Sequence, residues 1–177
     1  MKKYYCIILL LFICNLAYTQ DIIISGKNEN RLLSWDDFKG RPDPNSSHDA
    51  YTFWNINYGM KGMKLSGDTV KIGSFAVTLS LEDNQSWIKP QKQTDRLLKH
   101  EQGHFDIGLI CQREVMRQLN STVFFNNGLQ EKIQTLFSSI LNKYHLLGQQ
   151  YDKETDHSKN QQAQDSWNVF FAKELNR

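Results

Sequence analysis

His100, Glu101 and His104 form the spacing His-Glu-x-x-His, the pattern in this chain with the clearest chemical meaning. Histidines four residues apart on an α-helix lie about 40° apart around its axis and one turn apart along it, so both imidazoles can face one ion. The glutamate lies close enough to the same point to hold a water molecule without being a ligand itself. The pattern therefore predicts a zinc ion bound by His100 and His104, with Glu101 as general base.

A catalytic zinc site needs a third protein ligand and one open position. The same helix does not supply it, because Ile107 and Ile110 stand where the extended pattern has glycine and histidine. If that helix continues for about 16 residues beyond His104, a second helix returning beside it brings the polar segment 151–157 level with the histidines. The candidates for the third ligand in that segment are, in order of preference, His157, Asp152 and Glu154.

Other residues have expected roles around this site. Tyr151 is a candidate donor of a hydrogen bond to the oxyanion of a hydrolysed amide. Gly103 costs a helix about 1 kcal/mol relative to alanine, which a close approach by a strand or a substrate would justify. His48 and His145 have no partner at ligand spacing, so we expect them in a loop and on a helix surface. Cys111 is expected to be a small buried hydrophobe.

The elements that must position these residues follow from the hydrophobic pattern. Alternating aromatic, β-branched and polar residues from position 51 to 81, interrupted by a turn at 66–69, predict a hairpin. Thr94 is a suitable cap for a helix ending near Asn120, and helical periodicity recurs from Leu129 to Tyr144 and in 159–175. The predicted class is α+β and zincin-like: a small antiparallel sheet, preceded by a short strand at 21–25, then the long His-Glu-x-x-His helix and two further helices.

Length and charge limit what the chain can be. With 177 residues, 40% of them hydrophobic, it is long enough for one globular domain. Lys2 and Lys3 precede an apolar run at 4–16, so residues 1–19 are predicted to be a signal peptide and 20–177 a single exported domain, periplasmic or secreted. The remaining 19 basic and 19 acidic residues balance, which argues against a nucleic-acid partner, and no transmembrane segment is expected in the mature chain.

Four segments resemble a family of bacterial exported domains described as predicted secreted zinc-dependent proteases. They are Leu33–Gly40 with its sequence LSWDDFKG, the QSWI of 85–88 with the HEQGHFDI of 100–107, and the tail at 151–157 that matches YDxxTxH. The resemblance covers nearly the whole mature chain, and Ser158 departs from it because the family usually has glycine there. It implies a zinc metalloprotease-like fold, His100 and His104 as ligands, Glu101 as general base and His157 as third ligand.

Two functions are compatible with these residues. The first is an exported zinc metalloprotease that hydrolyses peptide or protein substrates through a zinc-activated water, with an extended peptide paired to an edge strand at 75–81. The second is a catalytically inactive, zinc-stabilised binding or structural module of the cell envelope, in which Asp152 and His157 together close the site.

Overall fold

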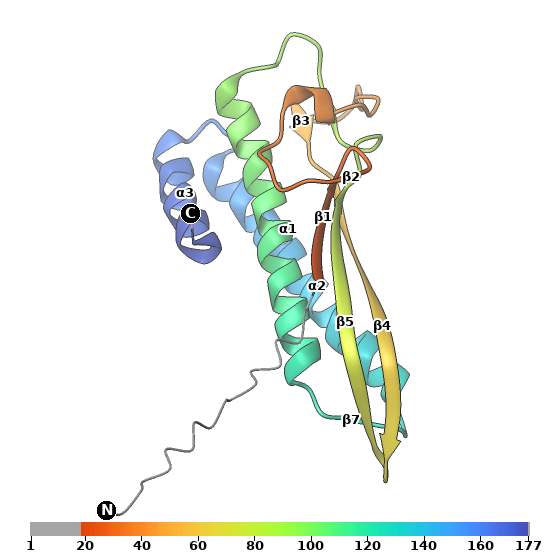
Figure 1. The fold of residues 1–177 in the computed structure, drawn as a ribbon. Helices are drawn as coiled ribbons and strands as arrows, with labels where there is room; N and C mark the ends of the chain where they lie inside the picture. Colours follow the sequence, from red (N-terminus) through yellow and green to blue (C-terminus); the bar gives the residue numbers. More distant parts are fainter. Residues whose placement is uncertain (1–18, 177) are drawn as a thin grey trace, which may run out of the picture.

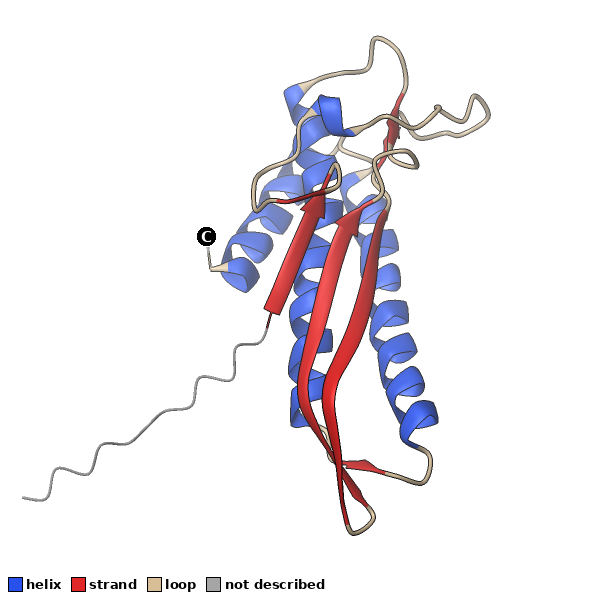
Figure 2. Cartoon of the chain, turned by 45° about the vertical axis from the view of Figure 1, so that its right-hand side comes forward, coloured by secondary structure: helices blue, strands red, loops and turns tan. Residues whose placement is uncertain are grey.

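The computed structural model describes residues 19–176 of the chain, and the predicted signal peptide, residues 1–19, lies outside them except for Thr19. A mixed sheet is followed by three α-helices, which lie on one face of the sheet (Figures 1 and 2). The predicted α+β class is therefore confirmed. Among residues 19–176, no helix combines the length and the hydropathy needed to cross a membrane.

The sheet is built around a long hairpin of β4 (Trp54–Ser66) and β5 (Thr69–Leu81). The strand order is β2-β1-β5-β4, in which β1 spans Thr19–Ile24 and β2 spans Lys27–Asn28. A short strand, β7 (Phe124–Phe125), pairs with β5 near the hairpin turn. The hairpin strands are antiparallel, as predicted, whereas β1, which contains most of the short strand expected at 21–25, joins the sheet by pairing with β5 in parallel. The chain reverses once before β4 and again at the hairpin turn, so β1 and β5 run in the same direction.

β5 lies between β1 and β4 in this sheet, and its side chains alternate between core and surface. Phe75, Val77, Leu79 and Leu81 are buried, while the residues between them are partly exposed. With β1 on one side and β4 on the other, β5 cannot accept an extended peptide along 76–80. The expectation that 75–81 is an edge strand for substrate is therefore wrong.

The strand predicted to begin at Tyr51 is divided into two. Ala50 and Tyr51 form β3, which pairs with β6 (Trp87–Ile88) in a separate two-stranded sheet. The main sheet begins only at Trp54, because the backbone N–H of Phe53 is bonded to the hydroxyl of Ser86 at 2.9 Å instead of a ladder partner. This interruption directs Thr52 toward the helices, where it is buried.

Two long helices carry the candidate site. α1 (Asp95–Ser121) begins at Thr94, whose hydroxyl accepts a hydrogen bond from the backbone N–H of Leu97 as predicted for a cap. α1 packs across β5, and its buried residues include Phe105, Ile107 and Cys111, which is buried as expected. α2 (Leu129–Thr155) returns beside α1 and extends well beyond Tyr144, so it reaches back to the histidines.

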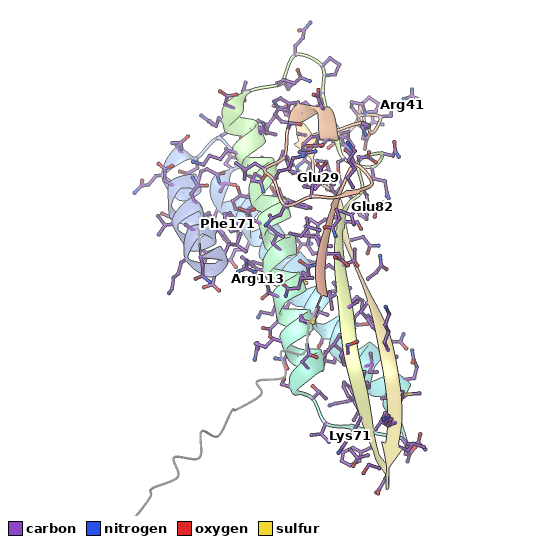
Figure 3. All side chains as sticks on the ribbon, in the orientation of Figure 1. Glu29, Arg41, Lys71, Glu82, Arg113 and Phe171 are labelled. Carbon is purple, nitrogen blue, oxygen red and sulfur yellow. The ribbon has the colours of Figure 1, made fainter. Side chains whose placement is uncertain are left out.

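α3 (Gln161–Leu175) packs on α1 and α2 (Figure 1). It begins at Asn160, whose side chain accepts a hydrogen bond from the N–H of Ala163. Phe171 of α3 is buried. Near the C-terminal end of α3, the carbonyl oxygen of Glu174 accepts a hydrogen bond from Arg113 of α1. Figure 3 labels both Phe171 and Arg113. These contacts fix the position of α3 behind the histidine-bearing part of α1.

Candidate metal centre

His100 and His104 face the same carboxylate oxygen. Their Nε2 atoms lie 3.1 and 3.0 Å from Oδ1 of Asp152, and the two rings stand edge to face with centroids 5.0 Å apart. Tetrahedral zinc keeps neighbouring nitrogen and oxygen ligands about 3.3 Å apart, which is close to these distances. The structure thus groups His100, His104 and Asp152 as three donors that could hold a metal ion.

Asp152 reaches the histidines because α2 runs back along α1, as the lengths of the helices predicted. Burial raises the pKa of the Asp152 carboxyl. The hydrogen bonds with His100 and His104 lower this pKa by more than burial raises it, so it lies well below its ordinary value. Burial lowers the pKa of His104, yet its hydrogen bond with Asp152 raises it more, so the pKa is raised overall. Asp152 is therefore ionised and supplies a negative charge between two imidazoles.

His100 is oriented by α3. Its Nδ1 lies 3.2 Å from Oε1 of Gln164 and its Nε2 faces Asp152, so a ring only 2% exposed has a pure acceptor on both sides. A neutral imidazole carries one N–H, so if Nδ1 donates to Gln164, Nε2 presents a lone pair toward the Asp152 carboxylate and cannot also donate to it. A cation between Nε2 and Asp152 resolves this conflict, and these residues therefore fit a bound divalent metal.

Glu101 is held beside this group by β3 and the residue that follows it. Its side chain is 3% exposed, and its Oε2 accepts a hydrogen bond of 2.6 Å from the hydroxyl of Thr52. Glu101 also lines the cavity that includes His100, His104 and Asp152. Thr52 therefore fixes the orientation of a buried carboxylate next to the candidate metal ligands.

Tyr151 lies beneath the two histidines. Its side chain is fully buried, its ring stacks on His100 with centroids 4.6 Å apart, and its hydroxyl donates to the carbonyl oxygen of His100 at 3.1 Å. Gly103 makes room for it, because a Cβ at that position would lie 2.6 Å from Cζ of Tyr151. The close neighbour of Gly103 is therefore Tyr151 of α2, and not the strand or substrate that was expected. This geometry supports a role of Tyr151 in positioning His100.

His157 follows α2 in a tight turn. Asp156, His157 and Ser158 have φ angles of 45°, 50° and 77°, three left-handed residues in succession. The third of these values explains why glycine suits position 158. Nδ1 of His157 lies 3.2 Å from Oδ1 of Asp152 but is buried without a hydrogen-bond partner among residues 19–176.

The three predicted candidates for the third ligand thus have different surroundings. Asp152 contacts both histidines, and His157 contacts Asp152. Glu154 is directed elsewhere, since its Oε2 accepts a hydrogen bond from the indole of Trp167 at 2.8 Å and its Oε1 accepts one from Gln150.

Two cavities meet at this centre. A mostly polar cavity of about 280 Å³ includes His100, Glu101 and His157 in its wall. A neighbouring cavity of about 360 Å³ has a more apolar wall that includes Trp54, Ile56, Ile107, Leu141 and Tyr144. Both are lined by the residues around the carboxylate, which are His48, Tyr51, Thr52, His104 and Asp152.

Three residues of this centre had no sequence signal. His48, Tyr51 and Thr52 come from the segment before β4, about 50 residues from the histidines of α1. No spacing rule connects the two segments, because their contact depends on how the chain crosses the sheet. His48, expected to be an ordinary loop residue, is instead half-buried and stands edge-on to His157 with ring centroids 4.4 Å apart. His145 is exposed on α2, as expected.

A family model described as a bacterial protein of unknown function (DUF922) matches residues 19–158. No curated protein and no solved structure matches the chain. The matched region contains all the candidate ligands as well as Glu101 and Thr52, whereas Gln164 and the rest of α3 lie beyond it.

Proposed function

The chain belongs to DUF922, a family of bacterial proteins of unknown function, and we propose that it is an exported zinc-dependent peptidase. The observation that carries this proposal is the position of Glu101. A buried carboxylate, fixed by Thr52, lines the same cavity as His100, His104 and Asp152. A metal site with a general base beside it is an arrangement that supports metal-assisted amide hydrolysis.

Each group has a defined task in this reaction. Bound zinc would polarise the amide carbonyl and lower the pKa of a water molecule toward 7. Glu101 takes the proton from that water and later passes it to the leaving nitrogen, so one carboxylate serves as base and then as acid. Thr52 keeps the Glu101 carboxylate in one orientation during both transfers. Gln164 orients the His100 ring through its contact with Nδ1, and Tyr151 donates a hydrogen bond to the His100 carbonyl oxygen.

Tyr51 is the hydroxyl best located to stabilise an oxyanion in this mechanism. It lines both cavities, whereas Tyr151 is fully buried. Burial raises the pKa of the Tyr51 hydroxyl, and the negative charges of Asp152 and Glu101 raise it further. The hydroxyl therefore stays protonated at neutral pH and remains a hydrogen-bond donor.

The substrate that suits these cavities is an extended peptide with an apolar side chain next to the cleaved bond. The larger cavity offers an apolar wall directly beside His104 and Asp152. β3 is paired only with β6 within residues 19–176, and Ala50 and Tyr51 line the polar cavity. A peptide lying in that cavity could use the backbone of β3 for strand pairing, a role that β5 cannot fill.

The contacts of Asp152 with three imidazoles favour a second candidate function. If His100, His104, Asp152 and His157 all bound one ion, the site would be closed and the metal would stabilise a binding or structural module. Such a module would hold zinc without turnover.

Replacement Glu101→Gln tests the proposed peptidase. Zinc-loaded protein should cleave a mixture of fluorescence-quenched peptides, and the variant should keep its zinc while losing about 100- to 10,000-fold in rate. Glu114→Gln, a change on the same helix at a residue paired with Arg117, is the matched control and should retain both properties. Equal rates for Glu101→Gln and the wild type would refute the role of Glu101. Bound zinc without cleavage in the wild type would support the structural module.

A further inference from the structure

A second group of metal-ligand side chains lies beside the first. The donor atoms of His48, Asp152 and His157 lie within 4.8 Å of one another, as do those of His100, His104 and Asp152. We propose that His48, Asp152 and His157 bind a second divalent cation, so that Asp152 bridges two ions. This inference rests on the metal site of the proposed function, because the two groups share Asp152.

Asp152 is suited to a bridging role. Its Oδ1 lies 3.0 to 3.2 Å from imidazole nitrogens of His104, His100 and His157, so the carboxylate stands between the histidines of α1 and the turn after α2. A carboxylate has about four lone-pair directions on two oxygens and can serve two ions at once. Hydrolases with two metal ions hold them about 4 Å apart, a spacing that a shared carboxylate provides.

An independent observation that points to a bound cation comes from His157. Its Nδ1 is buried, contacts Asp152 at 3.2 Å and makes no hydrogen bond within residues 19–176. A buried polar atom without a partner costs about 1 to 3 kcal/mol, so such atoms are rarely left unsatisfied. A cation between this nitrogen and the carboxylate would give the nitrogen the partner that it lacks.

The backbone that holds His157 is itself costly. Three consecutive residues without a glycine, 156–158, have left-handed φ angles, each of which costs about 1 to 2 kcal/mol. The turn is fixed by Arg96 of α1, which donates to the carbonyl oxygen of Ser158, and by a hydrogen bond of 2.7 Å from Asn160 N–H to the Thr155 carbonyl oxygen. Backbone strain persists where surrounding contacts impose it, and strained residues cluster at functional sites.

His48 is also held in place from its own loop. The backbone N–H of His48 donates to the hydroxyl of Ser46, and Nζ of Lys89 donates to the Ser46 carbonyl oxygen at 2.6 Å. The backbone N–H of Lys89 donates to the Asp49 carbonyl oxygen as well. His48 therefore faces His157 from a loop anchored on both sides, and both residues line the polar cavity.

The donor set and its exposure indicate the kind of ion. Two imidazoles and one carboxylate favour a borderline transition metal such as zinc or cobalt over calcium or magnesium. All three residues are half-buried, whereas His100 is buried, and the single negative charge is shared with the first ion. The second ion should therefore bind more weakly and exchange faster than the first.

The number of ions bound by the purified protein tests this inference. Metal-free protein is titrated with zinc and, separately, with cobalt, and the ions per chain are counted by native mass spectrometry and calorimetry. Two ions are expected for the wild type, the second held more weakly, and only one for His48→Ala and for His157→Ala. His145→Ala, which removes an exposed histidine of α2, is the matched control and should still bind two. Metal-free wild type and metal-free His48→Ala should unfold at the same temperature, which separates ligand loss from misfolding.

The outcomes distinguish this inference from the proposed function. One ion in the wild type, lost in His100→Ala and retained in His48→Ala, overturns the second site and leaves the first intact. Two ions in both the wild type and His48→Ala also overturn it, because the second ion would then lie elsewhere. Protein that binds no ion contradicts both proposals.

Discussion

Gln164 lies with its Oε1 3.2 Å from Nδ1 of His100, so a residue of α3 orients a candidate ligand on α1. The same amide donates to the hydroxyl of Tyr151 at 2.7 Å, which places its oxygen, and not its nitrogen, toward the histidine. The family match ends at residue 158, before α3 begins. The candidate metal centre therefore depends on an element outside the segment that the family model matches.

Replacement Gln164→Leu should weaken zinc binding about 10- to 100-fold, because His100 loses the acceptor that fixes its tautomer and ring orientation. Competition with a zinc chelator measures this affinity directly. Gln161→Leu changes an exposed residue one turn earlier on α3 and should leave the affinity unchanged. Equal affinities for Gln164→Leu and the wild type would show that the hydrogen bond has no influence on the ligand.

Replacement Thr52→Val removes the hydroxyl that donates to Glu101 at 2.6 Å and keeps the shape of the side chain. If Thr52 positions the general base, kcat should fall about 100-fold while zinc content and KM stay near those of the wild type. Thr52→Ser restores the donor and should recover most of the rate. A Thr52→Ser variant as slow as Thr52→Val would point to packing instead of the hydrogen bond.

Replacement Gly103→Ala should destabilise the protein by about 1 to 3 kcal/mol. The new methyl group would meet the buried ring of Tyr151, and this overpacking exceeds the gain in helix propensity. Gly148→Ala is the opposite case within α2, because its Cβ would meet only Nδ1 of His104 at 3.8 Å. It should stabilise by about 0.5 to 1 kcal/mol. Urea unfolding of the two variants at neutral pH compares these signs.

Asp37 should make stability depend on pH. Its carboxylate is 2% exposed, and although burial raises its pKa, the hydrogen bond from Arg31 and those from Ser34 lower it to about 2. The folded pKa lies below the unfolded value, so the contribution is complete above about pH 4 and is lost as the pH falls toward 2. The shift corresponds to about 2 kcal/mol.

The measurement compares the free energy of unfolding of wild type and Asp37→Asn between pH 7 and 2. The difference should be largest at pH 7 and shrink below pH 4, because protonation makes the wild type resemble the variant. Asp36→Asn, at the exposed neighbouring residue, should stay within about 0.5 kcal/mol of the wild type at every pH. A difference that does not change with pH would exclude this pair as the cause.

Much of this arrangement could be predicted from local rules. The alternation of Phe75, Val77, Leu79 and Leu81 defined a strand, and Thr94 marked the start of α1 within one residue. Counting the rise per residue along two antiparallel helices brought segment 151–157 back to the histidines. The break between β3 and β4 could not be predicted, because it depends on the hydroxyl of Ser86, more than 30 residues away from Phe53.

The sequence by itself determined that two imidazoles and a carboxylate lie on one face of a helix, because helical periodicity alone fixes their directions. Only the tertiary structure decided which side chains complete that face. Asp152 lies within the last turn of α2, whereas His157 lies in the left-handed turn that follows it. Their order in the chain therefore does not reveal which of them contacts the two histidines of α1. Thr52, His48 and Gln164 join the centre through contacts between elements far apart in sequence, and such contacts are set by the packing of the sheet and helices and not by local spacing.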